Sequence, residues 1–292
     1  MRRYRFFLPS FYLLLSNIFC SCTSTVPPEE HTSKLINSFF EMPESEDAYI
    51  FFRFYDPVYK NPLYIANLLK TGIEITEVND FSASHVAFSF SLDDCFLGLT
   101  SFTTPNLDYE ICSDNFYNPY ITQCDKKKSK AYIYALKVTK EERDAAVKII
   151  QDNRNVTYDT MMNFIMADRS IKRIFVRKEE DKKLDIYGRT EQNTDEINDR
   201  ENMIENKKFV CSTFSAYILY NSVQSCHDFF YDNTIDYHYL GVTDISVLPG
   251  MQKLFECTWE DYEKSAENFV NEHKEFKPFL TEINFHVKPS KV

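Results

Sequence analysis

The spacing of apolar segments in the first half of the chain constrains the fold most strongly. Three segments are predicted as strands: AYIFFRFYD at 48–56, SHVAFSFSL at 84–92 and CFLGLTSF at 95–102. In the second segment apolar residues alternate with small or polar ones, which is the period of a strand with two unlike faces. Because only the short SLDD connection separates the second segment from the third, we expect these two to form an antiparallel hairpin.

A fourth predicted strand is followed at once by a predicted helix. AYIYALKV at 131–138 has strand character, and TKEERDAAVKIIQDN comes directly after it. Thr139 as N-cap and Glu142 three residues later form the sequence pattern of a capping box. Strands gather in the first half and helices are interspersed without regular βαβ alternation. The fold class that this order favours is α+β rather than a parallel sheet.

Composition places the chain among ordinary globular proteins. It has 292 residues, of which 43% are hydrophobic and 16% aromatic, enough to form the core of one large domain or two small ones. The formal net charge is −11, which has the wrong sign for a protein whose main partner is a phosphate backbone. We therefore expect no nucleic-acid partner.

The N-terminus resembles an export signal. MRRYR is followed by a mostly apolar run of 14 residues, FFLPSFYLLLSNIF, which fits a signal segment better than a membrane-spanning helix. Residues 1–22 are therefore expected to direct export to the periplasm or cell surface. Cys22, preceded by the small Ser21, resembles a bacterial lipoprotein processing site and is the candidate lipidation residue. Ordinary cleavage nearby and an uncleaved anchor are the alternatives, and any membrane attachment is expected only through this segment.

The remaining chain is predicted to form a tether and one domain. Residues 23–46 are polar and acidic and read as a tether with one short helix around KLINSFF, so the fold is expected to occupy 47–292. Charged residues of both signs dominate 177–208, which reads as a solvated insertion. Smaller predicted features are a helix at 61–72, a helix or irregular segment at 163–175, an aromatic loop at 227–240, a short helix capped by Thr243 or Asp244, and a terminal strand at 282–290.

The segment FVCSTFSAYILY at 209–220 places a cysteine where a helix begins. Cys211, Phe214, Ser215 and Ile218 have the spacing of one helical face, so Cys211 is predicted to lie in the first turn. There the helix dipole favours an anion, which lowers a thiol pKa and suits a nucleophile. The other reading is that Cys211 is a small apolar core residue.

Six cysteines follow Cys22, and no CxxC pair occurs among them, so neither a zinc ribbon nor a thioredoxin motif is supported. Export permits disulfides, with Cys112–Cys124 and Cys226–Cys257 as candidate pairs. No metal or organic cofactor is expected. A thiol nucleophile needs an imidazole nearby, and among the six histidines His85 is the candidate because it opens a predicted strand after a small polar residue.

The order of these segments resembles the circularly permuted, NlpC-type branch of the papain-like cysteine hydrolases. The resemblance covers about residues 47–265 and rests on SHVAFSF, CFLGLTSF, AYIYALKVTKEERDAAVKII, the pair YD at 158–159, VCSTFSAYIL and TDISVLPGMQKLFE. In that family the histidine strand precedes the cysteine helix, the reverse of the order in papain. The resemblance implies a papain-like fold in which Cys211 is the nucleophile and His85 the base.

The resemblance also implies a third polar residue and an oxyanion donor. Family members often carry a glutamate on the strand after the histidine, whereas the LTSF stretch offers only Thr100 or Ser101, of which Ser101 is the choice. Tyr158 is the implied second oxyanion or substrate contact, beside the backbone N–H of Cys211; its alternative role is aromatic packing. The implied activity is cysteine peptidase or amidase action on a cell-wall peptide or acyl amide. Alternatives are an inactive binding module, a lipid acyl hydrolase or acyltransferase, and an unrelated secreted protein.

Overall fold

The computed structural model describes residues 30–60, 83–100, 107–112, 119–159, 207–233, 235, 237 and 240–281. Several predicted features lie outside these residues: the export segment with Cys22, the helix at 61–72, the segment 163–175, most of the charged insertion, and the terminal strand. No helix among the described residues is long and apolar enough to cross a membrane.

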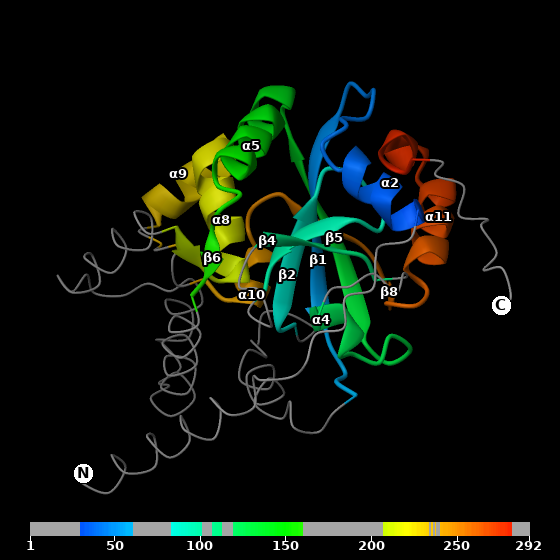
Figure 1. The fold of residues 1–292 in the computed structure, drawn as a ribbon. Coiled ribbons are helices and arrows are strands. Elements are labelled where there is room, and N and C mark those ends of the chain that lie inside the picture. The colour runs from blue at the N-terminus through cyan, green and yellow to red at the C-terminus, as the bar shows by residue number, and fades with distance from the viewer. Residues whose placement is uncertain are drawn as a thin grey trace, which may run out of the picture.

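A six-stranded antiparallel sheet forms the centre of the molecule (Figure 1). Its strand order is β4-β3-β2-β1-β5-β8, so that β1 pairs with both β2 and β5. The strands are β1 (Ala48–Asp56), β2 (His85–Ser89), β3 (Phe96–Leu99), β4 (Leu107–Glu110), β5 (Lys130–Val138) and β8 (Met251–Thr258).

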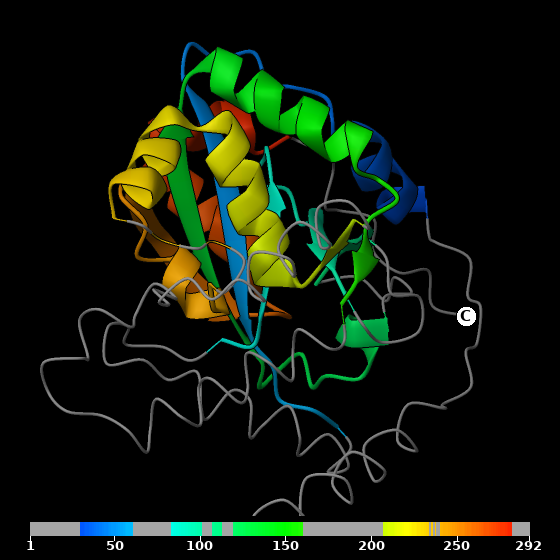
Figure 2. The same ribbon diagram turned by 90° about the vertical axis from the view of Figure 1, so that its left-hand side faces the viewer.

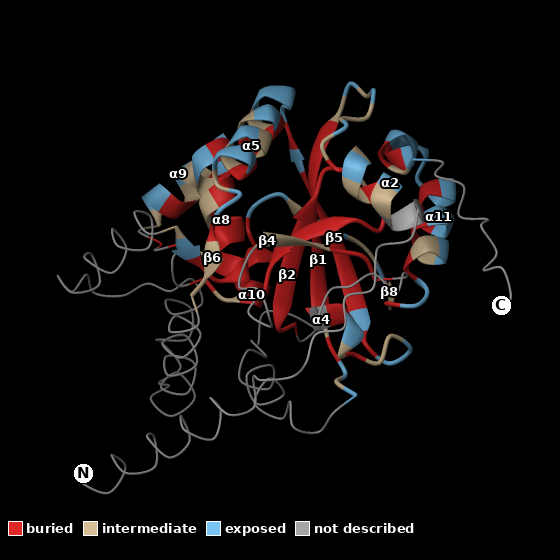
Figure 3. Cartoon of the chain, viewed as in Figure 1, coloured by how far each residue is buried: buried red, intermediate tan, exposed pale blue. Residues whose placement is uncertain are grey.

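The central strand is apolar on both faces, which explains why it lies between two layers. Phe52 and Phe54 belong to one hydrophobic cluster, whereas Phe51 and Tyr55 belong to a second. Since successive side chains of a strand point to opposite faces, the run IFFRFY supplies both layers at once. Strands β1, β2 and β3 are accordingly buried along almost their whole length (Figure 3), whereas the edge strand β8 is partly exposed.

Helices cover the two faces of the sheet. The cluster that contains Phe52 also contains apolar residues of α5 and α8, and Figure 2 shows these two helices crossing in front of the sheet. The cluster that contains Phe51 is completed by α11 and the 3-10 helix η3. The helices are α2 (Glu30–Ser38), α4 (Pro119–Thr122), α5 (Lys140–Asp152), α8 (Cys211–Ser222), α9 (Gln224–Asp232), α10 (Val242–Ile245), α11 (Tyr262–Glu272) and η3 (Lys274–Phe279). A small parallel pair, β6 (Thr157–Tyr158) and β7 (Lys208–Phe209), lies apart from the main sheet.

The α+β class and the main local predictions are confirmed. β2 and β3 pair antiparallel, as the SLDD connection predicted. The capping box is present, since the Thr139 hydroxyl accepts from the Glu142 N–H at 3.1 Å and the Glu142 carboxylate accepts from the Thr139 N–H at 2.8 Å. α8 begins at Cys211, as its apolar period indicated.

Three local predictions need correction. The first part of the predicted aromatic loop, 227–232, belongs to the helix α9, whose Cys226 and Phe230 are four residues apart and both buried against α8 and its neighbours. The short helix expected around KLINSFF is present as α2, but it packs on the domain, since its Leu35 lies in the core at 0% exposure. The short helix α10 has Gly241 as its N-cap, and Asp244 lies inside the helix, where its carboxylate accepts from the Gly241 N–H.

We expect Glu142→Ala to lower the free energy of unfolding by about 1–2 kcal/mol. One carboxylate oxygen of Glu142 caps the N-terminus of α5, and the other accepts from the Gln224 N–H at 2.8 Å, where α9 begins. The exposed neighbour Glu141→Ala is the matched control and should change stability by less than half as much. Urea unfolding of both variants measures the difference, and equal effects would contradict the double capping role.

Candidate active site

The thiol of Cys211 lies in the first turn of α8. Val210 precedes it as the N-cap, with extended backbone (φ −101°, ψ 171°). The Thr213 hydroxyl accepts from the Val210 N–H at 2.9 Å and donates to the Val210 carbonyl at 3.2 Å, which fixes the turn from within. Cys211 is free of any disulfide and only 3% exposed. The turn therefore holds the thiol at the positive end of a helix of 12 residues.

The chain reaches this turn through the small parallel strand pair. Phe209 in β7 is paired with Tyr158 in β6, and the Asp159 N–H donates to the Phe209 carbonyl at 2.8 Å. The Phe209 ring packs on Phe214 of α8, with centroids 5.5 Å apart. These contacts place Tyr158, which is half-buried, beside the residue two positions before Cys211.

The imidazole of His85 lies at the start of β2 and meets the thiol. His85 is 5% exposed and is hydrogen-bonded to Cys211. In the register of the sheet it is paired with Tyr55 of β1, and the two ring centroids are 5.3 Å apart. The structure thus brings together two side chains that are 126 positions apart in the sequence.

The third partner is Glu110, which sequence reasoning missed. Its Oε1 atom lies 2.6 Å from Nε2 of His85, and the residue is fully buried at the end of β4. That contact leaves Nδ1 of the imidazole for the thiol. Ser101, the predicted third residue, lies outside the described residues. The LTSF stretch carries no acid, as the sequence indicated, but a carboxylate reaches His85 from the next strand, β4.

Gly98 explains how the carboxylate can reach the imidazole. A Cβ atom at this position would lie 2.1 Å from Oε1 of Glu110 and 2.9 Å from Nε2 of His85. Gly98 is in β3, which runs between the strands of His85 and Glu110. A glycine inside a strand pattern often marks close approach of another group, so the G of CFLGL was the available signal for this pair.

Burial and neighbouring charges shift the pKa of His85 in opposite directions. Burial alone lowers the pKa of an imidazole, but the Glu110 and Cys211 charges and hydrogen bonds to both raise the pKa of His85 to about 10. The imidazole therefore holds its proton at neutral pH when a thiolate faces it. This is the protonation state of a thiolate–imidazolium pair.

The other described cysteines differ from Cys211 in their surroundings. Burial raises the pKa of each of these thiols, to about 12 for Cys226 and Cys257. None of the six described cysteines forms a disulfide, so the candidate pairs Cys112–Cys124 and Cys226–Cys257 are not bridged. The remaining thiols have raised pKa values too, namely Cys95, Cys112 and Cys124.

Buried polar atoms without a hydrogen-bond partner gather at the same place. Within the part of the chain that the structure describes, these atoms are Ser84 Oγ, Glu110 Oε2 and Ser212 Oγ. Ser84 adjoins His85 and Ser212 adjoins Cys211 in the sequence. Buried groups of this kind are rare in folded proteins and occur where function needs them.

Among the described residues, no group of three or more His, Cys, Asp or Glu side chains has the arrangement of a metal site. No protein-family model, curated protein or solved structure matches the chain. The assignment of chemistry to this site therefore rests on its geometry.

We expect Gly98→Ala to separate Glu110 from His85. The added methyl group cannot coexist with the carboxylate oxygen at 2.1 Å, so the side chain of Glu110 must move. Alkylation of Cys211 at pH 7 should slow by at least tenfold, and the free energy of unfolding should fall by about 1–3 kcal/mol. Gly241→Ala is the control, because its Cβ would approach no atom closer than 3.2 Å. Unchanged alkylation in Gly98→Ala would contradict the assigned geometry.

The raised pKa of His85 predicts a pH dependence of stability. Below the ordinary imidazole pKa of about 6.5 both folded and unfolded states carry the proton, and the stabilisation by Glu110 is fully present. Between pH 6.5 and about 10 only the folded state keeps the imidazole proton of His85. The stabilisation by Glu110 therefore declines over this range and is lost as the pH passes the folded-state pKa. Urea unfolding measured between pH 6.5 and 10 should show that the free energy of unfolding declines more steeply with pH in the wild type than in His85→Asn. Parallel curves for the two proteins would refute the assignment.

Proposed function

We propose that the protein is a cysteine hydrolase of the permuted, NlpC-type papain-like family that cleaves an amide bond through an acyl-enzyme. The observation that carries this proposal is the line of three side chains Cys211, His85 and Glu110. A thiol at a helix start, an imidazole in contact with it and a carboxylate 2.6 Å from the far ring nitrogen are the parts that a cysteine nucleophile requires.

In the first half of the proposed reaction, the Cys211 thiolate attacks the carbonyl carbon of the substrate. A carbon–sulfur bond forms and the carbonyl electron pair moves to oxygen. The backbone N–H of Cys211, at the first position of α8, is the proposed donor to that oxyanion, and Tyr158 is the proposed second contact. When the intermediate collapses, the carbon–nitrogen bond breaks and the His85 imidazolium gives its proton to the leaving amine.

In the second half, neutral His85 takes a proton from water as the water oxygen attacks the thioester. The carbon–sulfur bond breaks, the acid product leaves, and the thiolate–imidazolium pair is restored. Glu110 holds the ring orientation throughout and stabilises the imidazolium form. A carboxylate does this better than the hydroxyl of Ser101 would, because it carries the opposite charge to the imidazolium.

The order of elements supports the family proposal. The histidine strand β2 precedes the cysteine helix α8 in the chain, and the sheet between them is antiparallel. A peptide or acyl amide is the proposed substrate class. An acidic protein with net charge −11 is poorly suited to an anionic lipid surface, which favours the amide over a lipid ester. Export through residues 1–22 belongs to the same proposal.

The test is the rate at which iodoacetamide alkylates Cys211 in the folded protein, measured by mass spectrometry of its peptides. We expect fast labelling of Cys211 at pH 6–7, where an ordinary thiol with a pKa of about 8.5 is mostly protonated. Glu110→Gln, which keeps shape and loses charge, should slow the labelling by about 10- to 100-fold, and His85→Ala at least as much. The other described cysteines, with their raised pKa values, serve as internal references.

A second readout separates an enzyme from a binding module. With p-nitrophenyl acetate, the wild type should form an acetyl adduct on Cys211 that decays as water attacks, and Cys211→Ser should form none on this peptide. If iodoacetamide alkylates Cys211 no faster than Cys257, the hydrolase proposal is overturned. A fast thiol whose acetyl adduct persists for hours would instead favour a module that binds acyl groups without turnover.

A further inference from the structure

A buried arginine lies directly behind the Glu110–His85 pair. The side chain of Arg53, in β1, is 0% exposed, and its guanidinium is enclosed by rings of Phe96 and Tyr262 at 4.2 Å and 4.9 Å from their centroids. Asp94 forms an ion pair with it and is equally buried. A buried ion pair contributes little net stability compared with apolar packing, so its presence in the core calls for another explanation.

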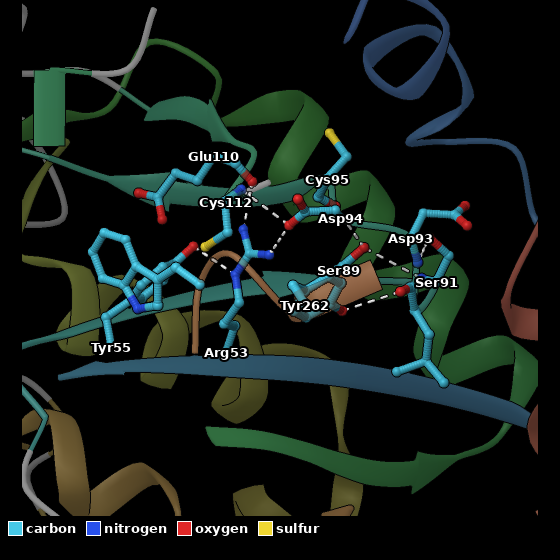
Figure 4. Close-up of polar contacts among 12 residues, drawn as sticks. Arg53, Tyr55, Ser89, Ser91, Asp93, Asp94, Cys95, Glu110, Cys112 and Tyr262 are labelled. Carbon is cyan, nitrogen blue, oxygen red and sulfur yellow. Dashed lines mark hydrogen bonds and ion pairs between the residues drawn. The ribbon is translucent and has the colours of Figure 1, made fainter. Parts of the chain in front are cut away.

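The remaining donors of Arg53 lead to the site (Figure 4). Nη2 donates to the backbone carbonyl of Glu110, and Nε donates to the Tyr55 hydroxyl at 2.7 Å. Arg53 and Tyr55 are two positions apart in β1 and therefore share a face of the sheet. The guanidinium of Arg53 thus holds the main chain at Glu110 and also the side chain of Tyr55. The Tyr55 ring in turn packs on the His85 ring.

The Tyr55 hydroxyl connects this arginine to the carboxylate. Tyr55 is fully buried, and burial raises the pKa of its hydroxyl well above the usual value, so the group stays neutral. Because its oxygen already accepts from Arg53, its single proton is free for an acceptor. The Glu110 carboxylate is that acceptor, through a side-chain hydrogen bond. A continuous buried chain of contacts results: Asp94, Arg53, Tyr55, Glu110, His85 and Cys211.

We propose that Arg53 and Tyr55 are positioning residues, which hold the Glu110 carboxylate against His85 and thereby maintain the thiolate–imidazolium pair. Arg53 fixes the backbone from which Glu110 extends, and the Tyr55 hydroxyl fixes the rotation of its carboxylate. This inference rests on the proposed function, since it assigns these residues a task in the same reaction. The groups that face the imidazole in this arrangement are Cys211 from α8, Glu110 from β4 and Tyr55 from β1.

The test compares two tyrosine-to-phenylalanine variants of the full chain. Tyr55→Phe removes the hydroxyl that contacts Glu110, whereas Tyr262→Phe removes an equally buried hydroxyl that donates to the Leu92 carbonyl at 3.0 Å. Both rings remain beside Arg53, so both variants keep the packing of the core. The measured quantity is the iodoacetamide rate at Cys211 from pH 4 to 11, alongside the urea midpoint of each variant.

Tyr55→Phe should slow alkylation at pH 7 by about tenfold, the usual effect of losing one hydrogen bond to a charged group. The acid limb of its pH profile should move to higher pH, because a carboxylate that is free to rotate stabilises the imidazolium, and with it the thiolate, less. Tyr262→Phe should lose comparable stability and keep the wild-type profile. A Tyr55→Phe profile that matches that of Tyr262→Phe overturns the inference while leaving the hydrolase proposal intact. A slow thiol in the wild type would instead refute the proposed function itself.

Discussion

The short contact between Glu110 and His85 is the interaction on which the rest of the site depends. An imidazole buried to 5% exposure favours its neutral form, and a neutral imidazole cannot hold a thiolate beside it. The Glu110 carboxylate, whose Oε1 atom lies 2.6 Å from Nε2 of His85, reverses this preference and favours the charged imidazole. The pair can form only because β3 carries Gly98 between the two strands, where any side chain would occupy the space of the carboxylate. A strand residue without a side chain is therefore a condition of the contact between Glu110 and His85.

The thiol and the imidazole come from two different kinds of element, and their meeting depends on how those elements are anchored. The parallel pair β6–β7 and the Thr213 hydrogen bonds fix the first turn of α8, while the register of β1 with β2 fixes the histidine. Behind them, the Arg53 network ties the acid to the central strand. Because Cys211, His85, Glu110 and the Arg53 network are all buried, a displaced group among them would lose its hydrogen bonds without gaining water in exchange, which favours one fixed geometry.

Local patterns in the sequence predicted much of this framework. The hairpin of β2 and β3, the strand β5, the capping box at Thr139 and the start of α8 at Cys211 follow from period, connection length and capping chemistry within a few neighbouring residues. The wrong predictions concern segments whose structure is decided by contacts with residues far away in the sequence. The aromatic segment after α8 forms helix α9 because Cys226 and Phe230 find an apolar surface to cover, and α2 joins the core through Leu35 for the same reason. Strand β8 and helix α11, which the sequence patterns did not predict, complete the sheet edge and its second layer.

The sequence by itself determined two candidate site residues: a cysteine where a helix dipole favours an anion, and a histidine that opens a strand. The tertiary structure alone decided that the acid is Glu110 rather than a hydroxyl from LTSF, and that Arg53 lies behind it. The physical reason is that the partner of a side chain in a sheet is set by strand order and register. Strand order and register are decided by the packing of the whole core, and the glycine at position 98 indicates only that some group approaches β3 closely, not which one.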